Sequence, residues 1–355
     1  MVDYSKIEFG YHGGTFSEKE LEMAQREKTP LTLDMAIPCS CLNKCYYCGY
    51  KDTQEGDKLS KEEIFSVIEQ FKEIGGKSIK ILGEGEPLLR KDIFEIFEHI
   101  HKIGLIPVLF TCGDVLGNNN LTKEIHGITA KEVIQKLKNC NATIMLKYEK
   151  KNEDSIVGKK GFSKKRNIAL ERLLSSGFNK FSPTHLGFGI VVLKENHSEI
   201  AKVYEMALKQ NIYPLLCPLM PIGKAQDSEW RKEIGISAKQ MVEMAKQLYS
   251  IAKKRGVKPK CAADFPGGLP CDVARAGFYI ADTGKIYLCE DEEYVGTVRE
   301  MNLKEAWKKI FEWKNQKYGK ERWSGKCCQK RKIQVIPETY DAEVAKGIFN
   351  KTKRD

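Results

Sequence analysis

From residue 31 onward the sequence alternates six times between a short apolar run and an amphipathic stretch with helical spacing. Such alternation is typical of parallel sheets, whose strands are joined by right-handed helical crossovers. Eight units close a full barrel, so six predict an open, partial (β/α)6 barrel of the α/β class, with its chemistry at the carboxyl ends of the strands. The predicted strands are Leu31–Ile37, Ser78–Leu82, Ile106–Thr111, Ala142–Tyr148, Gly187–Leu193 and Ile212–Pro218. The predicted helices are Lys61–Ile74, Lys91–Ile103, Ala130–Lys138, Lys164–Ser176, His197–Gln210 and Ser237–Arg255.

The pattern changes after Arg255. Prolines and glycines interrupt the chain between 259 and 270, and a hairpin pattern follows at Gly277–Ala281 and Lys285–Leu288. A further helix is predicted over Asn302–Gln316. We therefore expect an N-terminal extension over 1–30, the partial barrel over 31–256, a small cysteine-rich domain over 257–345 and a tail over 346–355.

Twelve cysteines are many for a chain that begins without a secretory signal. No stretch approaches the roughly 20 apolar residues that cross a bilayer, so we expect a cytoplasmic protein without a membrane partner. In that compartment disulfides are disfavoured, and clustered cysteines indicate metal. The net charge of +11 is spread over several segments, which favours a solvated basic surface over a nucleic-acid groove and leaves an acidic partner open.

Three cysteines, Cys41, Cys45 and Cys48, lie within eight residues directly after the first predicted strand. Thiolates suit iron–sulfur clusters or zinc. A four-iron cluster held by three cysteines keeps one iron without a protein ligand, and an open metal position indicates chemistry. A structural zinc site needs a fourth ligand, which only Cys39 supplies nearby; otherwise Cys39 is a small packed residue.

The CxxxCxxC spacing of these cysteines resembles the motif of the radical S-adenosylmethionine (SAM) superfamily. The resemblance implies a [4Fe–4S] cluster whose open iron binds the methionine part of SAM, with Tyr47 against the adenine. An electron from the reduced cluster then cleaves SAM to methionine and a 5′-deoxyadenosyl radical, which takes a hydrogen atom from a substrate. It also implies a reductant partner such as flavodoxin or ferredoxin.

The second predicted strand is followed by Gly83, Glu84, Gly85, Glu86 and a proline. This segment resembles the GGEP motif that holds the SAM amino group in the family, with Glu84 where the second glycine usually stands. Glycines at a strand end let the backbone approach a ligand, and a carboxylate accepts hydrogen bonds from an ammonium group.

Two more residues are SAM-binding candidates by resemblance. Asn196 follows the fifth strand, as in relatives. The fourth strand departs from the family's Ser-Leu-Asp-Gly and ends in Lys147, Tyr148 and Glu149. Lys147 either pairs with the SAM carboxylate or is an ordinary strand-end lysine.

A second cysteine group lies near the C-terminus. Cys271, twelve residues, Gly284, four residues and Cys289 fit the signature of the SPASM and shorter twitch domains of the family. The resemblance implies one auxiliary [4Fe–4S] cluster, held by Cys261, Cys271, Cys289 and one of Cys327 and Cys328. If Cys261 is not a ligand, an open auxiliary iron binds substrate instead of only moving electrons; a four-thiolate zinc site is the alternative.

The sequence leaves the reaction open. An auxiliary cluster favours oxidation of a C–H centre in a small molecule or peptide. Peptide maturation or epimerisation is the second reading, and it needs a thiol donor near the radical. Cys217 and Cys112 end the sixth and third strands and are candidate hydrogen donors. The alternative is that both are inert residues packed in the core. A zinc-binding scaffold or nucleic-acid adaptor is the alternative from another class.

Overall fold

The computed structural model describes residues 9–49, 56–217, 219, 227–257, 275–288 and 293–318. Within those ranges no helix has the length and apolar character that a membrane crossing requires. The strands are β1 (Thr32–Met35), β2 (Ser78–Ile81), β3 (Ile106–Thr111), β4 (Thr143–Lys147), β5 (Leu186–Val191), β6 (Tyr213–Cys217), β7 (Gly277–Ile280), β8 (Lys285–Tyr287) and β9 (Tyr294–Thr297).

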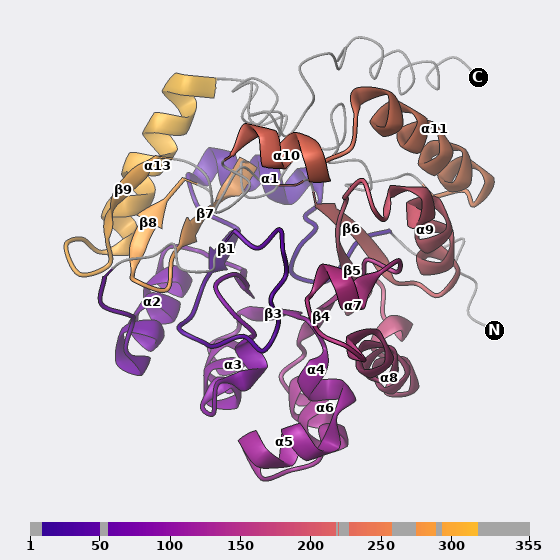
Figure 1. Cartoon of the computed structure of the whole chain (residues 1–355). Helices are drawn as coiled ribbons and strands as arrows, with labels where there is room; N and C mark the ends of the chain where they lie inside the picture. The colour runs from indigo at the N-terminus through magenta and orange to yellow at the C-terminus, as the bar shows by residue number, and fades with distance from the viewer. Residues whose placement is uncertain are drawn as a thin grey trace.

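One curved sheet carries all of these strands, in the order β6-β5-β4-β3-β2-β1-β7-β8-β9 (Figure 1). Strands β1 to β6 pair in parallel, each with its neighbour in sequence. The six strands predicted from the sequence are confirmed, and their ends differ by no more than two residues. Because β6 pairs only with β5 in this order, the six units form the predicted open, partial barrel.

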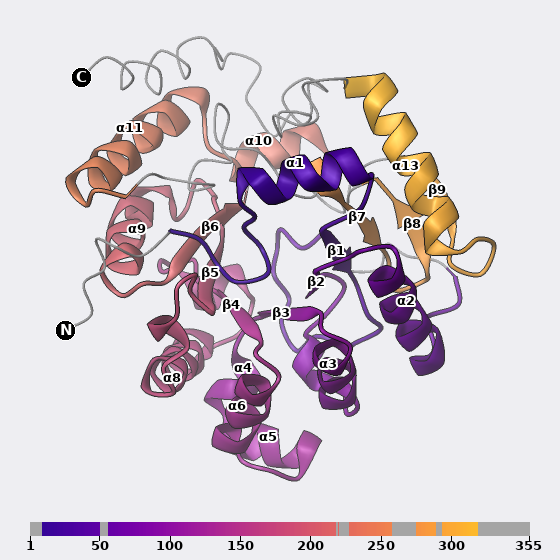
Figure 2. The same cartoon turned by 180° about the vertical axis from the view of Figure 1, so that it is seen from behind.

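The helices pack around the outer side of the sheet (Figures 1 and 2). The six predicted helices are present, with the fifth beginning as a short 3₁₀ turn. Ser60 and Thr129 cap two of them in reciprocal bonds with Glu63 and Glu132, which satisfies their free amides. The helices are α1 (Glu18–Glu27), α2 (Lys61–Glu73), α3 (Ile93–Lys102), α4 (Asp114–Gly117), α5 (Asn119–His126), α6 (Ala130–Asn139), α7 (Glu153–Ile156), α8 (Phe162–Ser175), α9 (Ile200–Lys209), α10 (Ser228–Ile234), α11 (Ala238–Lys254) and α13 (Leu303–Tyr318).

The N-terminal extension closes the amino-end side of the barrel. Tyr11 forms an isolated bridge with Thr184, and the amide of His12 donates to the Thr184 carbonyl at 2.9 Å. The Tyr11 ring packs with Val108 and Tyr213 in the barrel interior. Helix α1, seen in front in Figure 2, was not predicted, although its Ser17 cap is a helix-start signal. The open side of the barrel is therefore the one where the strands end.

The predicted hairpin is confirmed as β7 and β8, but it is joined to the barrel rather than separated from it. β7 pairs in parallel with β1, and β9, which was not predicted, extends the sheet further. The predicted helix appears as α13, whose Trp307 donates to the Lys28 carbonyl at 2.6 Å. The described part of 257–345 thus shares one sheet and one core with the barrel. That the region from 257 to 345 holds an auxiliary cluster remains a prediction.

Candidate functional site

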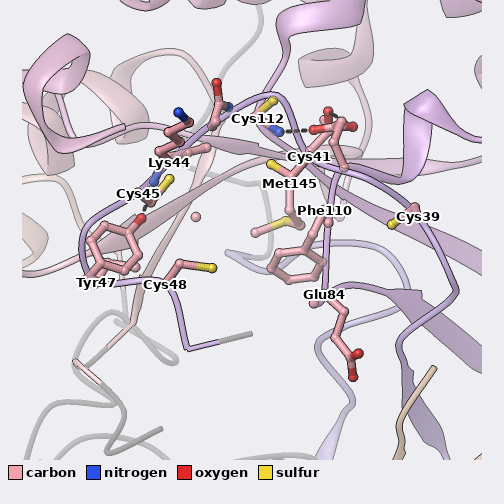
Figure 3. Close-up of a pocket in the computed structure, with 18 of the residues that line it drawn as sticks. Cys39, Cys41, Lys44, Cys45, Tyr47, Cys48, Glu84, Phe110, Cys112 and Met145 are labelled. Atoms are coloured by element: carbon pink, nitrogen blue, oxygen red, sulfur yellow. Dashed lines mark hydrogen bonds between the residues drawn. The ribbon is translucent and has the colours of Figure 1, made fainter. Parts of the chain in front are cut away.

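A cavity of about 690 Å³ opens where the strands of the barrel end. Every barrel strand contributes to its wall, through the loops after β1 and β2 and through residues at the ends of β3 to β6. Figure 3 shows that Lys44, Cys45 and Tyr47 lie on one side, whereas Glu84 and Cys39 lie on the other. Phe110 and Met145 form an apolar floor between them. Carboxyl ends of parallel strands are where α/β proteins bind ligands.

The loop after β1 brings the three motif cysteines to this cavity. Cys41, Cys45 and Cys48 all line it, and none is in a disulfide. The loop is held from outside, because the amides of Lys44 and Tyr46 donate to the carbonyls of Val157 and Ile156 at 2.8 and 3.1 Å. The sequence pattern therefore produces a cavity-facing thiol group on a backbone that is pinned to a neighbouring segment.

The thiols fit a multi-iron cluster better than a single ion. Within the described ranges no three His, Cys, Asp or Glu side chains converge as ligands of one metal ion. A single zinc requires such convergence, whereas a cubane distributes its cysteines over different irons. Burial raises the pKa of Cys45 to about 11, and the charges of Cys48 and Cys41 add to the rise. Bound iron is a cationic group that would favour the thiolate form of Cys45 despite this burial.

The segment after β2 lines the cavity and is bonded to the end of β3. Gly83, Glu84, Gly85 and Glu86, for which the sequence predicts SAM binding, all line the cavity. The Glu86 carboxylate is buried and accepts bonds from Thr111 Oγ1 (2.7 Å), the Cys112 amide (2.6 Å) and the Leu88 amide (3.1 Å). Burial raises its pKa despite these bonds. Glu86 therefore fixes the ends of β2 and β3 relative to one another.

Gly85 is where this segment meets the cysteine loop. A Cβ added at Gly85 would lie 2.5 Å from the Cys39 carbonyl oxygen and 2.8 Å from that of Ser40. The next amide, of Glu86, donates to the Ser40 carbonyl at 2.8 Å. The glycine is needed for close backbone approach between the two loops.

Glu84 is part of a charged group on the far side of the cavity. Lys58 binds both oxygens of Asp282, at 2.7 and 2.6 Å, and lies 3.7 Å from Glu84 Oε2. The Tyr279 hydroxyl donates to Glu84 Oε1 at 3.2 Å. Burial, and then the bond and charge of Asp282, raise the pKa of Glu84 to about 8. Glu84 also has a left-handed backbone, with φ of 22°. Lys58 and Asp282 were not predicted, because they lie outside the motif segments.

On the near side, Lys147 at the end of β4 is already paired. Its ammonium lies 2.5 Å from Glu149 Oε1 and 4.6 Å from the centre of the Tyr47 ring. The Tyr47 hydroxyl donates to the same oxygen of Glu149 at 2.7 Å and also contacts the Lys147 ammonium. Glu149 is completely buried, and among the described residues its Oε2 has no hydrogen-bond partner. Sequence reasoning missed Glu149, although its position two residues after a predicted lysine at a strand end was a usable signal.

Of the remaining candidate residues, some line the cavity and others do not. Cys112 and Cys217 both line the cavity. Burial raises the pKa of Cys112 well above its usual value, so it is a neutral thiol. Asn196 is not brought to the cavity: it is fully buried, accepts from the Leu193 amide at 2.9 Å and donates to the Val191 carbonyl at 2.9 Å. Cys261, Cys271, Cys289, Cys327 and Cys328 lie outside the described residues.

Comparisons with known proteins agree with this geometry. The family model described as Radical SAM superfamily matches residues 35–207. The chain is 37% identical over 73 residues to a GTP 3′,8-cyclase of Psychromonas ingrahamii, a match that spans 18% of this chain and 22% of that protein.

Among solved structures, the chain resembles native anSMEcpe with bound AdoMet and Cp18Cys peptide, with a TM-score of 0.59, 16% identity and coverage of 91% of this chain and 97% of that one. It also resembles SuiB of Streptococcus suis bound to S-adenosylmethionine, with a TM-score of 0.52, 13% identity and coverage of 90% and 74%. At these identities the likeness shows the fold.

Proposed function

Because residues 35–207 form a radical SAM domain and the chain is a radical SAM enzyme, we propose that Cys41, Cys45 and Cys48 hold a [4Fe–4S] cluster beside the cavity and that SAM binds there. When bound, the cluster supplies the electron that cleaves SAM reductively to methionine and a 5′-deoxyadenosyl radical. The substrate is a small molecule or peptide that fills the rest of the cavity and gives up a hydrogen atom to that radical.

The chain's own residues bind and orient SAM and the substrate, and they exclude water. Gly83 and Gly85 let the backbone after β2 approach a ligand, and Glu86 fixes that backbone to the end of β3. The pKa of Glu84 is raised to about 8 by burial and by Asp282, and the ammonium group of SAM bound beside it would favour its charged form. Phe110 and Met145 supply the apolar floor on which a nucleoside and substrate pack.

Lys147 is not a free lysine that could pair with the SAM carboxylate. Its charge is matched by Glu149 and it lies against the Tyr47 ring, so the three residues form one buried wall of the cavity. We assign Lys147 and Tyr47 to SAM binding as parts of this wall.

For the reaction, oxidation of a C–H centre is the first candidate. It requires an acceptor for the second electron, and the auxiliary [4Fe–4S] cluster proposed for Cys261, Cys271, Cys289 and one of Cys327 and Cys328 is suited to that task. A reduced flavodoxin or ferredoxin delivers the first electron. Replacement of Cys261 tests whether the auxiliary cluster is fully ligated, through the change in its magnetic spectrum.

Epimerisation of a peptide is the second candidate, favoured by one observation. Cys112 and Cys217 both line the cavity, which supports a role for either thiol in returning a hydrogen atom to a substrate radical. The similar anSMEcpe structure holds a peptide, Cp18Cys. Epimerisation incorporates solvent deuterium into the product, and incorporation that survives both Cys112→Ala and Cys217→Ala eliminates these donors.

The single observation that carries the proposal is the presence of three free thiols on one loop at the cavity wall. Cys45→Ala removes one of them, and Cys140→Ala, a buried cysteine outside the cavity, is the matched control. After anaerobic loading with iron and sulfide, we expect Cys140→Ala to keep its iron and to form 5′-deoxyadenosine from SAM with dithionite. Cys45→Ala should form 5′-deoxyadenosine at least about 100-fold more slowly than the wild type. A colourless wild-type protein with one zinc per chain would contradict the proposal.

A further inference from the structure

The segment before α1 lies at the amino ends of the barrel strands, where it runs toward β5 and β6 (Figure 2). We call residues 9–16 the N-terminal plug. Its backbone is bonded to the residues before β5, because His12 donates to the Thr184 carbonyl at 2.9 Å and Thr184 donates to the Gly10 carbonyl at 3.0 Å. The Thr143 hydroxyl, at the start of β4, donates to the His12 carbonyl at 2.8 Å. The bonds that hold the plug to the barrel are therefore gathered around His12.

The plug supports the floor of the cavity from the opposite side of the barrel. The Tyr11 ring is buried in one cluster with Val108, Met145 and Tyr213, and its centre lies 4.8 Å from that of the Tyr213 ring. Met145 belongs to this cluster and also lines the cavity, where it forms the floor with Phe110. The floor therefore rests on the plug through the contacts of Met145.

Two histidines meet where the plug is bonded to the barrel. The rings of His12 and His185 are stacked, with centres 4.5 Å apart and planes within 3° of parallel. The Phe181 ring packs on His185 at 4.3 Å, and His185 is only 7% exposed. Asn141 Nδ2 donates to His12 Nε2 at 3.2 Å, a bond that only an uncharged ring nitrogen accepts. Uncharged rings suit this arrangement, whereas two imidazolium rings would repel each other and lose their water.

No acidic group offsets a positive charge on this pair of rings within the described residues, where His99 is the only histidine in an ion pair. The charged residues that adjoin the pair on the packed elements are Lys138 of α6, Lys180 before β5 and Lys209 of α9. The nearest acidic residue along the described part of the plug's own chain is Glu18, which is in an ion pair of its own. The surroundings therefore favour two neutral rings.

Protonation consequently opposes the seated plug. Burial, and then the charge of His12, lower the pKa of His185 to about 4 in spite of a bond to the Ala142 backbone. Burial also lowers the pKa of His12. When the plug leaves the barrel, both rings enter water and their pKa returns to about 6.5. Because the released state then binds more protons, seating is fully favoured above pH 6.5 and weakens as pH falls from there toward 4.

We propose that the N-terminal plug is a pH-sensitive switch, which supports the cavity floor at neutral pH and leaves the barrel when protons bind the stacked pair of His12 and His185. Its effect on SAM rests on the function proposed above, whereas its release from the barrel does not.

Hydrogen exchange follows the plug directly. Protection factors of the amides in residues 9–16, corrected for the intrinsic exchange rate at each pH, are measured by mass spectrometry between pH 7.5 and 5.0. His185→Gln removes the buried titrating ring, and His185→Phe replaces it with an aromatic ring that carries no charge. His101→Gln, at an exposed position of α3, is the matched control.

In the wild type and in His101→Gln we expect the protection of the plug to fall by at least about tenfold over this range, since the shift of His185 alone corresponds to about 30-fold. In both His185 variants the fall should be at least about tenfold smaller. Helix α6 should keep its protection throughout, which shows that the protein remains folded.

A second measurement links the plug to the cavity. The Kd for SAM of the cluster-loaded protein is determined at pH 7.5 and 5.5. We expect the affinity of the wild type and of His101→Gln to fall at least about threefold more than that of His185→Phe, because Met145 loses its support only where the plug is released. The comparison between variants removes the effect of other titrating groups, such as Glu84.

The contrary outcomes are separate. Equal loss of plug protection in the wild type and in both His185 variants, or loss of α6 protection at the same pH, overturns the switch. Release of the plug with the same change of SAM affinity in every variant overturns its support of the floor. If the wild type binds no SAM even at pH 7.5, the proposed function fails, and the exchange measurement still decides whether the plug is released.

Discussion

The hydroxyl group of Tyr47 lies 2.7 Å from Oε1 of Glu149. This bond joins the loop that carries the motif cysteines to the end of β4, and Lys147 lies between the two partners. All three side chains line the cavity. The position of the cysteine loop, which follows β1, therefore depends on an ion pair at the end of β4, three strands away in the sheet.

Glu149→Gln removes the carboxylate that matches Lys147. Because the remaining ammonium is largely buried, we expect the free energy of unfolding to fall by about 3 kcal/mol. Tyr47→Phe removes the hydrogen bond from the Tyr47 hydroxyl to Glu149. We expect the free energy of unfolding to fall by about 1 kcal/mol and SAM binding to weaken several-fold, because this bond holds the cavity wall together. Tyr46→Phe, which loses a 3.1 Å bond to Glu195 outside the cavity, is the control and should leave SAM affinity unchanged. Equal SAM affinity in Tyr47→Phe and Tyr46→Phe would contradict this role of the wall.

Gly85→Ala places a methyl group against the carbonyls of Cys39 and Ser40, at 2.5 and 2.8 Å. The cysteine loop must then shift, so we expect the iron content after reconstitution to fall at least about threefold. Gly189→Ala is the control, because among the described residues its Cβ would meet only Phe110, at 3.9 Å. Iron and sulfide analysis measures the outcome. Full iron content in Gly85→Ala would show that the loop tolerates displacement.

Asn196→Ala separates a structural role from a ligand role. The side chain bonds the Leu193 amide and the Val191 carbonyl inside the protein. Its removal should lower the free energy of unfolding by about 2 kcal/mol and leave the Kd for SAM unchanged. A protein of normal stability that binds SAM tenfold more weakly would instead make Asn196 a SAM ligand, as the sequence resemblance implies.

Glu84 predicts a pH dependence of stability. Its pKa is raised to about 8 in the folded protein, so between the unfolded value and 8 the folded state holds the extra proton. The contribution is therefore present at low pH and is lost as pH rises through the folded pKa. Glu84→Gln cannot titrate, and its Tm should fall less than that of the wild type between pH 5 and 8. Parallel Tm profiles over this range would be inconsistent with the raised pKa.

The fold was largely predictable because each barrel unit has a local signal. Apolar runs such as Ile106–Thr111 and capped helices such as α6 are defined by neighbouring residues. The pairing of β7 with β1 could not be predicted, because it joins residues about 245 positions apart. The short helices α4 and α7, of four residues each, are too brief for a periodic pattern.

The site divides in the same way. Cys41, Cys45, Cys48 and the 83–86 segment were predicted from motif spacing, and the structure places them at one cavity. Lys58, Asp282 and Glu149 were missed because their roles depend on partners from other strands. The position of Asn196 after the fifth strand did not reveal that its side-chain amide bonds the Leu193 amide and the Val191 carbonyl; its binding of SAM remains a prediction.

The most direct measurement concerns the open iron. The reduced, cluster-loaded protein is mixed with SAM that carries ¹⁵N in the amino group and ¹⁷O in the carboxylate, and hyperfine couplings to the cluster are recorded. We predict coupling to both labels, with Cys41, Cys45 and Cys48 as the only protein ligands of that cluster. Absence of both couplings, or a fourth protein side chain on the cluster, would contradict the proposed chemistry at its origin.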